Sequence, residues 1–178
     1  MVNALGVQAV ALRAEFSADG KGASQRLWSE FAHAVTERFG TPGVDVLVNC
    51  AGIAPLATLE DTTDTLYEEV LSINLAAPFF LIQSASPHIR RGGRIINLSS
   101  ALTRIAAPSR AIYAASKGAI NTLTLALAAE YGPRGITVNA VAPGVIDTDM
   151  NSAWLNQSRE RAQAESLSVF GVSGSPMT

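Results

Sequence analysis

The chain has 178 residues, of which 48% are hydrophobic and 16% are charged, and its formal net charge is −2. This composition is typical of one globular domain with a core of its own. No basic run provides an electrostatic footprint for nucleic acid, so we expect no nucleic-acid partner. The one cysteine, Cys50, excludes an internal disulfide. We find no unbroken apolar run of about 18 residues and no signal peptide, so we expect a cytoplasmic protein without a membrane partner.

The first half of the chain predicts strands that alternate with a helix. Residues 7–12 alternate or run apolar, which predicts a strand that closes near Glu15. Apolar residues recur every four positions over 24–39 and predict an amphipathic helix that Gly40 ends. The apolar run at 44–49 predicts a buried parallel strand, and a turn follows it directly.

The rest of the chain continues the alternation with two long helices and a third, shorter one. We expect helices at about 61–89, 111–131 and 151–167, and strands at 94–98 and from 136 onward. The helix at 111–131 is apolar nearly all round, so one of its faces is expected to pack on the sheet and another on a partner subunit. Asn74 stands in the middle of the first long helix, where asparagine is a weak helix former that needs a reason to be present.

Tyr113 and Lys117 form the candidate site of chemistry. Their spacing of four residues places both side chains on one helix face. A unit charge at about 4 Å is worth roughly 4 kcal/mol at an effective dielectric constant of about 20. The ammonium is therefore expected to lower the pKa of the phenol and make it a usable acid or base near neutral pH. This spacing alone also occurs by chance on ordinary surface helices.

The surrounding motifs give the pair its context. They are GGRIINLSS at 92–100, a serine 13 residues before the tyrosine, YAASK at 113–117, ITVNAVAPG at 136–144, and P-G-x-x-x-T at 143–148. In this order and spacing they resemble the short-chain dehydrogenase/reductase family. The resemblance implies an α/β fold, a Rossmann-like doubly wound parallel sheet, and an NAD(P)-dependent oxidoreductase that interconverts a carbonyl and an alcohol.

The resemblance also implies a role for each catalytic residue. Tyr113 would exchange the proton, and Lys117 would lower its pKa and hold the nicotinamide ribose. Ser100 would hydrogen-bond the substrate oxygen, and Asn74 would hold a water that links the lysine to solvent. The alternative for Asn74 is a plain polar position on a helix.

Further residues are implied to bind NAD or NADP. Glu15 would border the adenine pocket, where aspartate is more usual; a solvated acid at a strand end is the alternative. Asn49-Cys-Ala-Gly52 resembles the family's N-N-A-G motif with cysteine in place of the second asparagine. The residues implied to line the cofactor site are Asn49, Ala51, Gly52, Tyr113, Lys117, Pro143, Gly144, Val145 and Thr148. His33 and His88 lack partners at ligand spacing, so we expect no metal site.

The chain also departs from the family pattern. It contains no T-G-x-x-x-G-x-G or G-x-G-x-x-G sequence, which is the turn that holds a pyrophosphate. The resemblance therefore implies a truncated fold, which lacks the first strand, the Gly-rich turn, the second strand and the C-terminal strand. In the family's strand order this leaves the strand at 44–48 with an open, apolar edge. Either the strand that starts at residue 7 moves inward to fill the gap, or we expect reduced stability or self-association.

Two functions remain open at this point. The first is the oxidoreductase; the second is a catalytically silent relative that serves only as a binding or oligomerisation module. The family is commonly dimeric or tetrameric through the two long helices, so a homo-oligomer is expected in either case. Similarity extends to 3-oxoacyl-carrier-protein reductases and to polyol or naphthol reductases, with none preferred. The choice between NAD and NADP stays open because both of the segments that usually decide it are absent.

Overall fold

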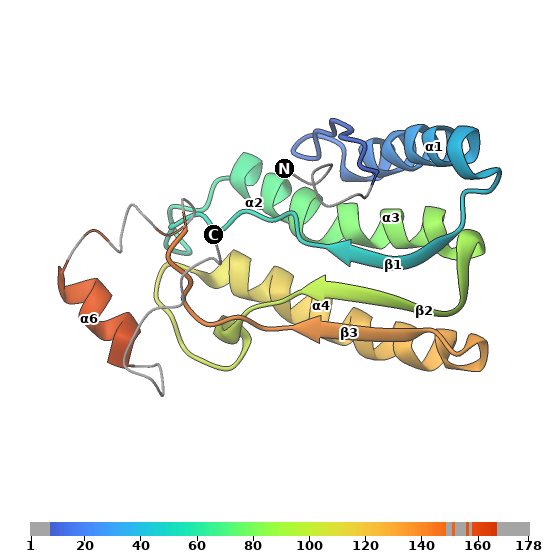
Figure 1. Ribbon diagram of the computed structural model, residues 1–178. Helices are drawn as coiled ribbons and strands as arrows, with labels where there is room; N and C mark the ends of the chain where they lie inside the picture. The colour runs from blue at the N-terminus through green and yellow to red at the C-terminus, as the bar shows by residue number, and fades with distance from the viewer. Residues whose placement is uncertain (1–7, 149–150, 152–155, 157, 167–178) are drawn as a thin grey trace.

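Three parallel strands form the sheet in the part of the chain that the structure describes. The structure is a computed structural model that describes residues 8–148, 151, 156 and 158–166. The strands are β1 (Val44–Asn49), β2 (Ile89–Leu98) and β3 (Thr137–Val141), in the order β1-β2-β3. All three arrowheads point to the same side of the molecule (Figure 1). The predicted α/β class with a parallel sheet is confirmed.

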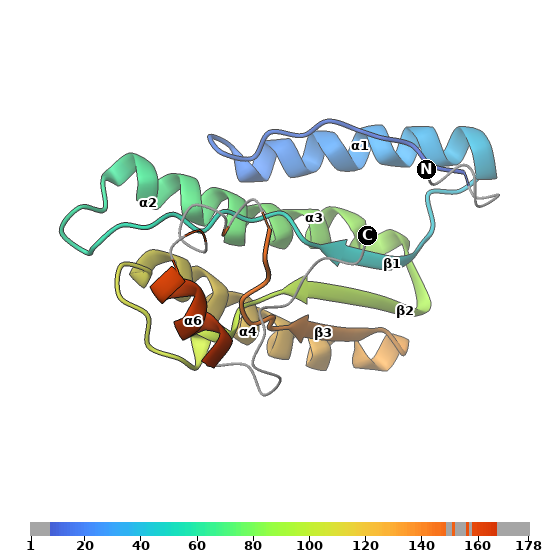
Figure 2. The ribbon, with the colours of Figure 1, turned by 60° about the vertical axis from the view of Figure 1, so that its left-hand side comes forward.

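One face of this sheet is covered by the long helices. α3 (Ala77–Ala85) packs against β1, α4 (Ala111–Tyr131) packs against β2 and β3, and α1 (Gly20–Phe39) packs on α3 (Figures 1 and 2). The register places Leu47, Ile95 and Val138 side by side on the covered face, where Ile95 is fully buried. The opposite face carries Val46 and Val48, which are 55% and 51% exposed. No described helix lies on that second face.

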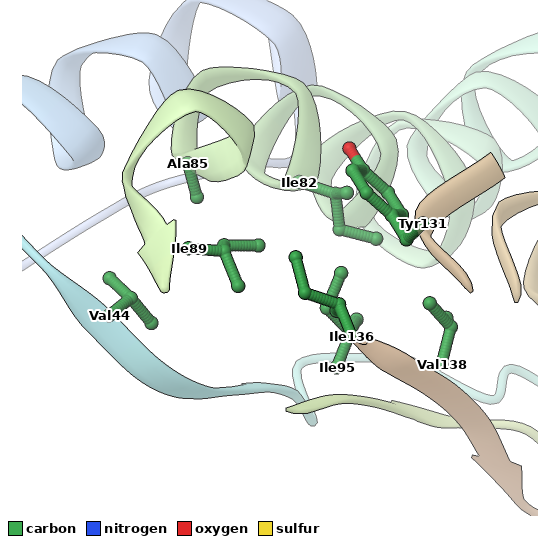
Figure 3. Close-up of a cluster of buried hydrophobic side chains, with 8 residues drawn as sticks. All are labelled: Val44, Ile82, Ala85, Ile89, Ile95, Tyr131, Ile136 and Val138. Atoms are coloured by element: carbon green, nitrogen blue, oxygen red, sulfur yellow. The ribbon is translucent and has the colours of Figure 1, made fainter. Parts of the chain in front are cut away.

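The core lies between the covered face and the helices, as Figure 3 shows. Its side chains come from β1, β2, β3, α3 and the end of α4, together with Ile136 just before β3: Val44, Ile82, Ala85, Ile89, Ile95, Tyr131, Ile136 and Val138. Trp28 of α1 packs against this cluster and lies 5.3 Å from the His88 ring. This contact packs α1 against the core.

Local capping sets the ends of α1. The Asp19 carboxylate accepts a hydrogen bond from the Gly22 amide at 2.7 Å, so the helix begins at Gly20 and not at 24 as its apolar pattern suggested. Gly40 adopts φ 74°, and its amide donates to the Thr36 carbonyl. Glycine takes this left-handed conformation without a steric penalty, and it ends the helix as predicted.

The first long helix is continuous but not uniform. It consists of α2 (Asp64–Leu71), a π-helical turn η2 (Ser72–Ala76), α3, and a short 3₁₀ turn η3 (Ser86–His88). By length and composition alone, Asp64–His88 could cross a membrane. In the structure, however, α3 carries buried core residues and packs between α1 and the sheet. We therefore interpret the segment as a core helix.

The remaining short elements lie near the ends of α4 and β3. They are the 3₁₀ turns η4 (Ala101–Thr103) and η5 (Gly132–Arg134) and the helix α6 (Ser158–Ser166). α6 lies beyond the carboxyl ends of the strands (Figure 1). The expected helix at 151–167 is therefore seen over its described C-terminal part.

One predicted strand and one predicted strand boundary were wrong. No strand forms in the described part of 7–12, because no partner strand lies beside these residues to take up their backbone N–H and C=O groups. β2 starts at Ile89 rather than 94, because Ile89 pairs with Val44 across a register shift. Gly92, with φ 79°, allows the chain to continue through the predicted turn without leaving the strand.

The free edge of β1 leads to a prediction about association. Within the described residues, β1 pairs only with β2, so the backbone groups on its other side can pair with a second chain. We expect the wild type to form concentration-dependent oligomers and the double variant Val46→Lys/Val48→Lys to weaken this association. Light scattering after gel filtration measures this, with Val141→Lys on β3, also about half exposed, as the control. Equal association by the wild type and the double variant would contradict the prediction.

Candidate active site

The candidate site lies where the three parallel strands end. β1 ends at Asn49, and β2 leads into Ser99 and Ser100. The segments after β2 and β3 are tied together, because the Ser99 amide donates to the Val141 carbonyl at 2.8 Å and the Ala101 amide donates to the Pro143 carbonyl at 3.0 Å. In open α/β sheets this edge is where ligands bind.

Lys117 is buried at the centre of this edge. It is 5% exposed, and its Nζ donates to the Leu98 carbonyl at 2.8 Å. The same Nζ lies 5.9 Å from the centroid of the Tyr113 ring. The two side chains therefore lie on the same side of α4, as the spacing predicts. Burial lowers the pKa of Lys117, and the nearby Cys50 thiol opposes this shift.

The contacts of Asn74 account for an asparagine in the middle of this helix. It is 1% exposed and sits within the π-helical turn η2, an irregularity that is frequent at functional sites. Its Oδ1 accepts from the Ile53 amide and its Nδ2 donates to the Ile53 carbonyl, both at 2.9 Å. One side-chain amide thereby satisfies both backbone groups of Ile53, in the loop that follows β1.

Gly52 lets these groups come together. A Cβ atom placed on Gly52 would lie 3.3 Å from Asn74 Oδ1 and 3.3 Å from Lys117 Nζ. That separation is tighter than ordinary van der Waals contact, so only glycine fits without moving a polar group. The loop after β1, the π turn and α4 meet at this point.

Ser116 was missed as a site residue by the sequence reasoning. It is fully buried; its Oγ accepts from Asn74 Nδ2 at 3.0 Å and donates to the Tyr113 carbonyl at 2.7 Å. It therefore connects the π turn to the backbone of α4 at the tyrosine. The sequence held one signal for Ser116: it is a hydroxyl residue directly before Lys117 in a helix that is otherwise largely apolar.

Ser100 lies at the start of the segment that follows β2. It is 7% exposed, and its Oγ accepts from the Leu102 amide at 3.2 Å. This bond uses an acceptor site only, so the hydroxyl proton stays available for a substrate oxygen. Neighbouring Ser99 directs its hydroxyl to the Lys117 carbonyl at 3.3 Å.

Asn49 takes part in a buried network that crosses the sheet. Its Nδ2 donates to Asn97 Oδ1 at 2.8 Å, and Asn97 Nδ2 donates to Thr124 Oγ1 at 3.0 Å. Asn97 and Thr124 are both buried. The network ties β1 and β2 to α4, whereas Cys50 beside it is exposed.

A comparison with protein families decides the identity of the fold. A family model described as enoyl-(acyl carrier protein) reductase matches residues 18–178. An uncharacterised oxidoreductase of Methylorubrum extorquens is 33% identical over 176 residues, which cover 98% of this chain and 68% of the relative. The chain belongs to the short-chain dehydrogenase/reductase family.

Named members of this family provide closer detail. A hydroxynaphthalene reductase of Aspergillus fumigatus is 34% identical, over 99% of this chain and 63% of its own length. The solved structure of the angucycline C-6 ketoreductase LanV with bound NADP has a TM-score of 0.90 at 35% identity, and the match covers 98% of this chain and 66% of LanV. This chain thus spans about two thirds of the length of those two proteins.

The structure places the other residues that the short-chain dehydrogenase/reductase resemblance implies. Glu15 is exposed on the segment before α1, and its carboxylate accepts from the Ser17 amide at 3.0 Å, which lowers its pKa. Its hydrogen bonding is local and does not bring it to the lysine and tyrosine. Ala51 is exposed beside Gly52.

The segment that follows β3 carries the last four of these residues. Pro143, Gly144, Val145 and Thr148 follow one another at the carboxyl end of the strand. Pro143 is fixed by its carbonyl to the segment after Ser100, through the Ala101 amide. The Thr148 carbonyl accepts from the Asn151 amide at 2.9 Å.

The buried charge of Lys117 predicts a pH dependence of stability. Because burial lowers its pKa below 10.5, the unfolded chain binds this proton more tightly than the folded chain. The free energy of unfolding therefore rises with pH between the lowered pKa and 10.5, and the gain is lost as pH falls. Relative to Lys117→Met, we expect the wild type to gain stability as pH increases through this window.

Urea unfolding across the alkaline range measures this difference. Both proteins carry Cys50→Ser, so that the thiol beside the lysine is absent from the comparison. If the difference in the free energy of unfolding between the protein with Lys117 and the Lys117→Met variant stays constant with pH, the prediction is wrong.

Proposed function

We propose that this chain carries the carbonyl-to-alcohol chemistry of an NAD(P)-dependent oxidoreductase. The observation that carries the proposal is the buried Lys117 ammonium, 5.9 Å from the Tyr113 ring and held by the Leu98 carbonyl. A fixed cation at this position stabilises negative charge on the phenol oxygen. Membership of the short-chain dehydrogenase/reductase family supports the same assignment.

Tyr113 gives the proton to the substrate oxygen in the direction of reduction and takes it back in oxidation. Reduction of a ketone builds alkoxide charge on that oxygen, and a donor within reach stabilises it. Ser100 provides a second donor, because its Oγ is engaged only as an acceptor from the Leu102 amide.

In this proposal Asn74 is a positioning residue, which holds other parts of the site in place. Its hydrogen bonds hold the Ile53 backbone and Ser116, so the loop after β1 and the start of α4 keep a fixed relation to Tyr113. The resemblance further implies that it holds a water of the proton relay to Lys117.

The residues present fit the nicotinamide end of a dinucleotide. Lys117 uses one of its three donors on Leu98, which leaves two for ribose hydroxyls, and Gly52 keeps the approach to Nζ free of a side chain. Pro143, Gly144, Val145 and Thr148 would line the carboxamide side, with Asn49 and Ala51 on the side of β1. When bound, NAD or NADP supplies or accepts the hydride.

Polycyclic phenolic ketones are the substrates we propose to test first. The relatives include the Aspergillus hydroxynaphthalene reductase and a versicolorin reductase of Emericella nidulans that is 42% identical over 125 residues. NADP is the cofactor named for LanV and for a short-chain dehydrogenase of Burkholderia cenocepacia at 39% identity. We further propose a cytoplasmic homo-oligomer in which the exposed side of α4, where Leu125 is 73% exposed, forms a second subunit contact besides the edge of β1.

The second candidate, a silent binding or oligomerisation module, is favoured by one observation. The sequence has no Gly-rich pyrophosphate turn. Titration of the chain with NADPH, followed by the fluorescence of the nicotinamide, separates the two functions. Micromolar binding together with NADPH oxidation by a ketone panel supports the oxidoreductase, and absence of binding supports the silent module.

A further inference from the structure

Arg110 is a buried cation that the proposed chemistry does not use. It directly precedes α4 and is 8% exposed. Its Nη1 donates to the Ala54 carbonyl. Burial lowers its pKa, and Tyr113 is the neighbouring group that opposes the shift. Tyr113 follows three residues later, in the first turn of α4.

Two buried cations thus flank Tyr113. Arg110 is the N-cap residue of α4, three positions before the tyrosine, and Lys117 lies one helical turn after it. Neither has a carboxylate within ion-pair distance in the described part of the chain, where the ion pairs belong to other residues: Arg26, His33, Arg90 and Arg161. Buried charges without a partner are costly and rare, so an anion from outside the protein is the natural complement.

The Arg110 guanidinium is fixed by one hydrogen bond and has N–H donors without a protein partner. Arginine has five N–H donors on three nitrogens, and only Nη1 has a protein partner. No fully buried side-chain nitrogen or oxygen of the described residues lacks a partner, so Nε and Nη2 of Arg110 remain accessible. The backbone next to it is fixed as well, since the Ser109 carbonyl accepts from the Ala57 amide at 3.0 Å. Ser109 itself adopts φ 57°, a conformation unusual for a residue other than glycine.

We propose that Arg110 binds an anionic oxygen of the substrate, a carboxylate or an ionised phenol or enol, close to the carbonyl that reacts at Tyr113. The planar fork of arginine suits such oxygens, and its tether to Ala54 presents the fork in one orientation. One helical turn, about 5 Å, separates Arg110 from the tyrosine along the axis, so the anionic group lies only a few bonds from the carbonyl. The inference rests on the proposed function and makes Arg110 a determinant of substrate specificity.

Binding of unreactive probes to the whole chain tests this without hydride transfer. 2-Naphthoate is compared with 2-naphthamide for a carboxylate, and 2,4-dinitro-1-naphtholate with its methyl ether for an ionised phenol. We expect the wild type to bind at least one anion about tenfold more tightly than its neutral counterpart, as expected for a charge-assisted hydrogen bond. Arg110→Gln should abolish this preference and keep the affinity for the neutral probe, and Arg110→Lys should retain part of it.

Arg91→Gln is the matched control, because Arg91 is exposed on β2 and the substitution removes the same charge. It should leave the preference for the anion unchanged. Equal affinity of the wild type for anion and neutral probe, a preference that survives in Arg110→Gln, or loss of both probes alike in that variant would overturn the inference. An intact preference together with no ketone reduction would count against the proposed function alone.

Discussion

Replacing Tyr113 by phenylalanine is expected to lower kcat for ketone reduction by about 10²–10⁴-fold, the range that general acid–base catalysis contributes. The variant removes one hydroxyl and keeps the ring whose centroid lies 5.9 Å from Lys117 Nζ. Binding of NADPH should stay within about twofold of the wild type, because the lysine donors are unchanged. Steady-state rates and a fluorescence titration on the same protein separate the two effects.

Tyr67→Phe provides the control for this substitution. Tyr67 is 49% exposed on α2 and belongs to no part of the site. Its variant should reduce ketones at the wild-type rate. Full activity of Tyr113→Phe would exclude the tyrosine as proton donor, whatever the behaviour of the control.

Replacing Asn74 by leucine is expected to lower the free energy of unfolding by about 3–5 kcal/mol. The wild-type amide makes three hydrogen bonds, to the Ile53 amide, the Ile53 carbonyl and Ser116 Oγ. Leucine has a similar volume but leaves these groups without that partner in a buried setting. Each one costs about 1–3 kcal/mol. Activity should fall together with stability, because the loop after β1 loses its anchor.

Gln83→Leu on α3 removes an amide of similar size from an exposed position. Urea unfolding of the two variants should show a large loss for Asn74→Leu and a change within about 0.5 kcal/mol for Gln83→Leu. Similar midpoints for the two variants would mean that the Asn74 network contributes little to stability.

Periodicity and turn residues predicted most of the fold. The strand at 44–49 and the helix at 111–131 were correct to the residue because each is bounded by clear local signals, such as the glycine before Val44 and the Gly-Pro pair after Tyr131. The absent strand near residues 8–12 could not be foreseen in this way. A strand depends on a partner elsewhere in the chain, and an alternating pattern does not report whether that partner is present.

The site was predicted in its parts but not in its connections. The four-residue spacing predicted that Tyr113 and Lys117 would share a side of α4, and the poor helix propensity of Asn74 indicated that it had a special role. The sequence could not show that a π turn directs Asn74 to Ile53, or that Ser116 links it to Tyr113. These contacts join residues 21 and 42 positions apart, which local patterns cannot relate.

Arg110 was missed for a similar reason. In the sequence Arg110 directly precedes a predicted helix, and this position does not indicate whether its side chain is buried or binds a ligand. Only the fold shows that it is 8% exposed and that it reaches the Ala54 carbonyl 56 residues earlier in the chain.

Transfer of deuterium from NADPH that carries deuterium at both C4 positions of the nicotinamide tests the central claim most directly. The chain is incubated with the labelled cofactor and a ketone, and the alcohol is analysed by mass spectrometry and NMR. The account predicts one deuterium on the carbinol carbon with the wild type, and labelled alcohol formed about 10²–10⁴-fold more slowly with Tyr113→Phe. Alcohol formed without the label, or no alcohol from a wild-type chain that binds NADPH, would contradict it.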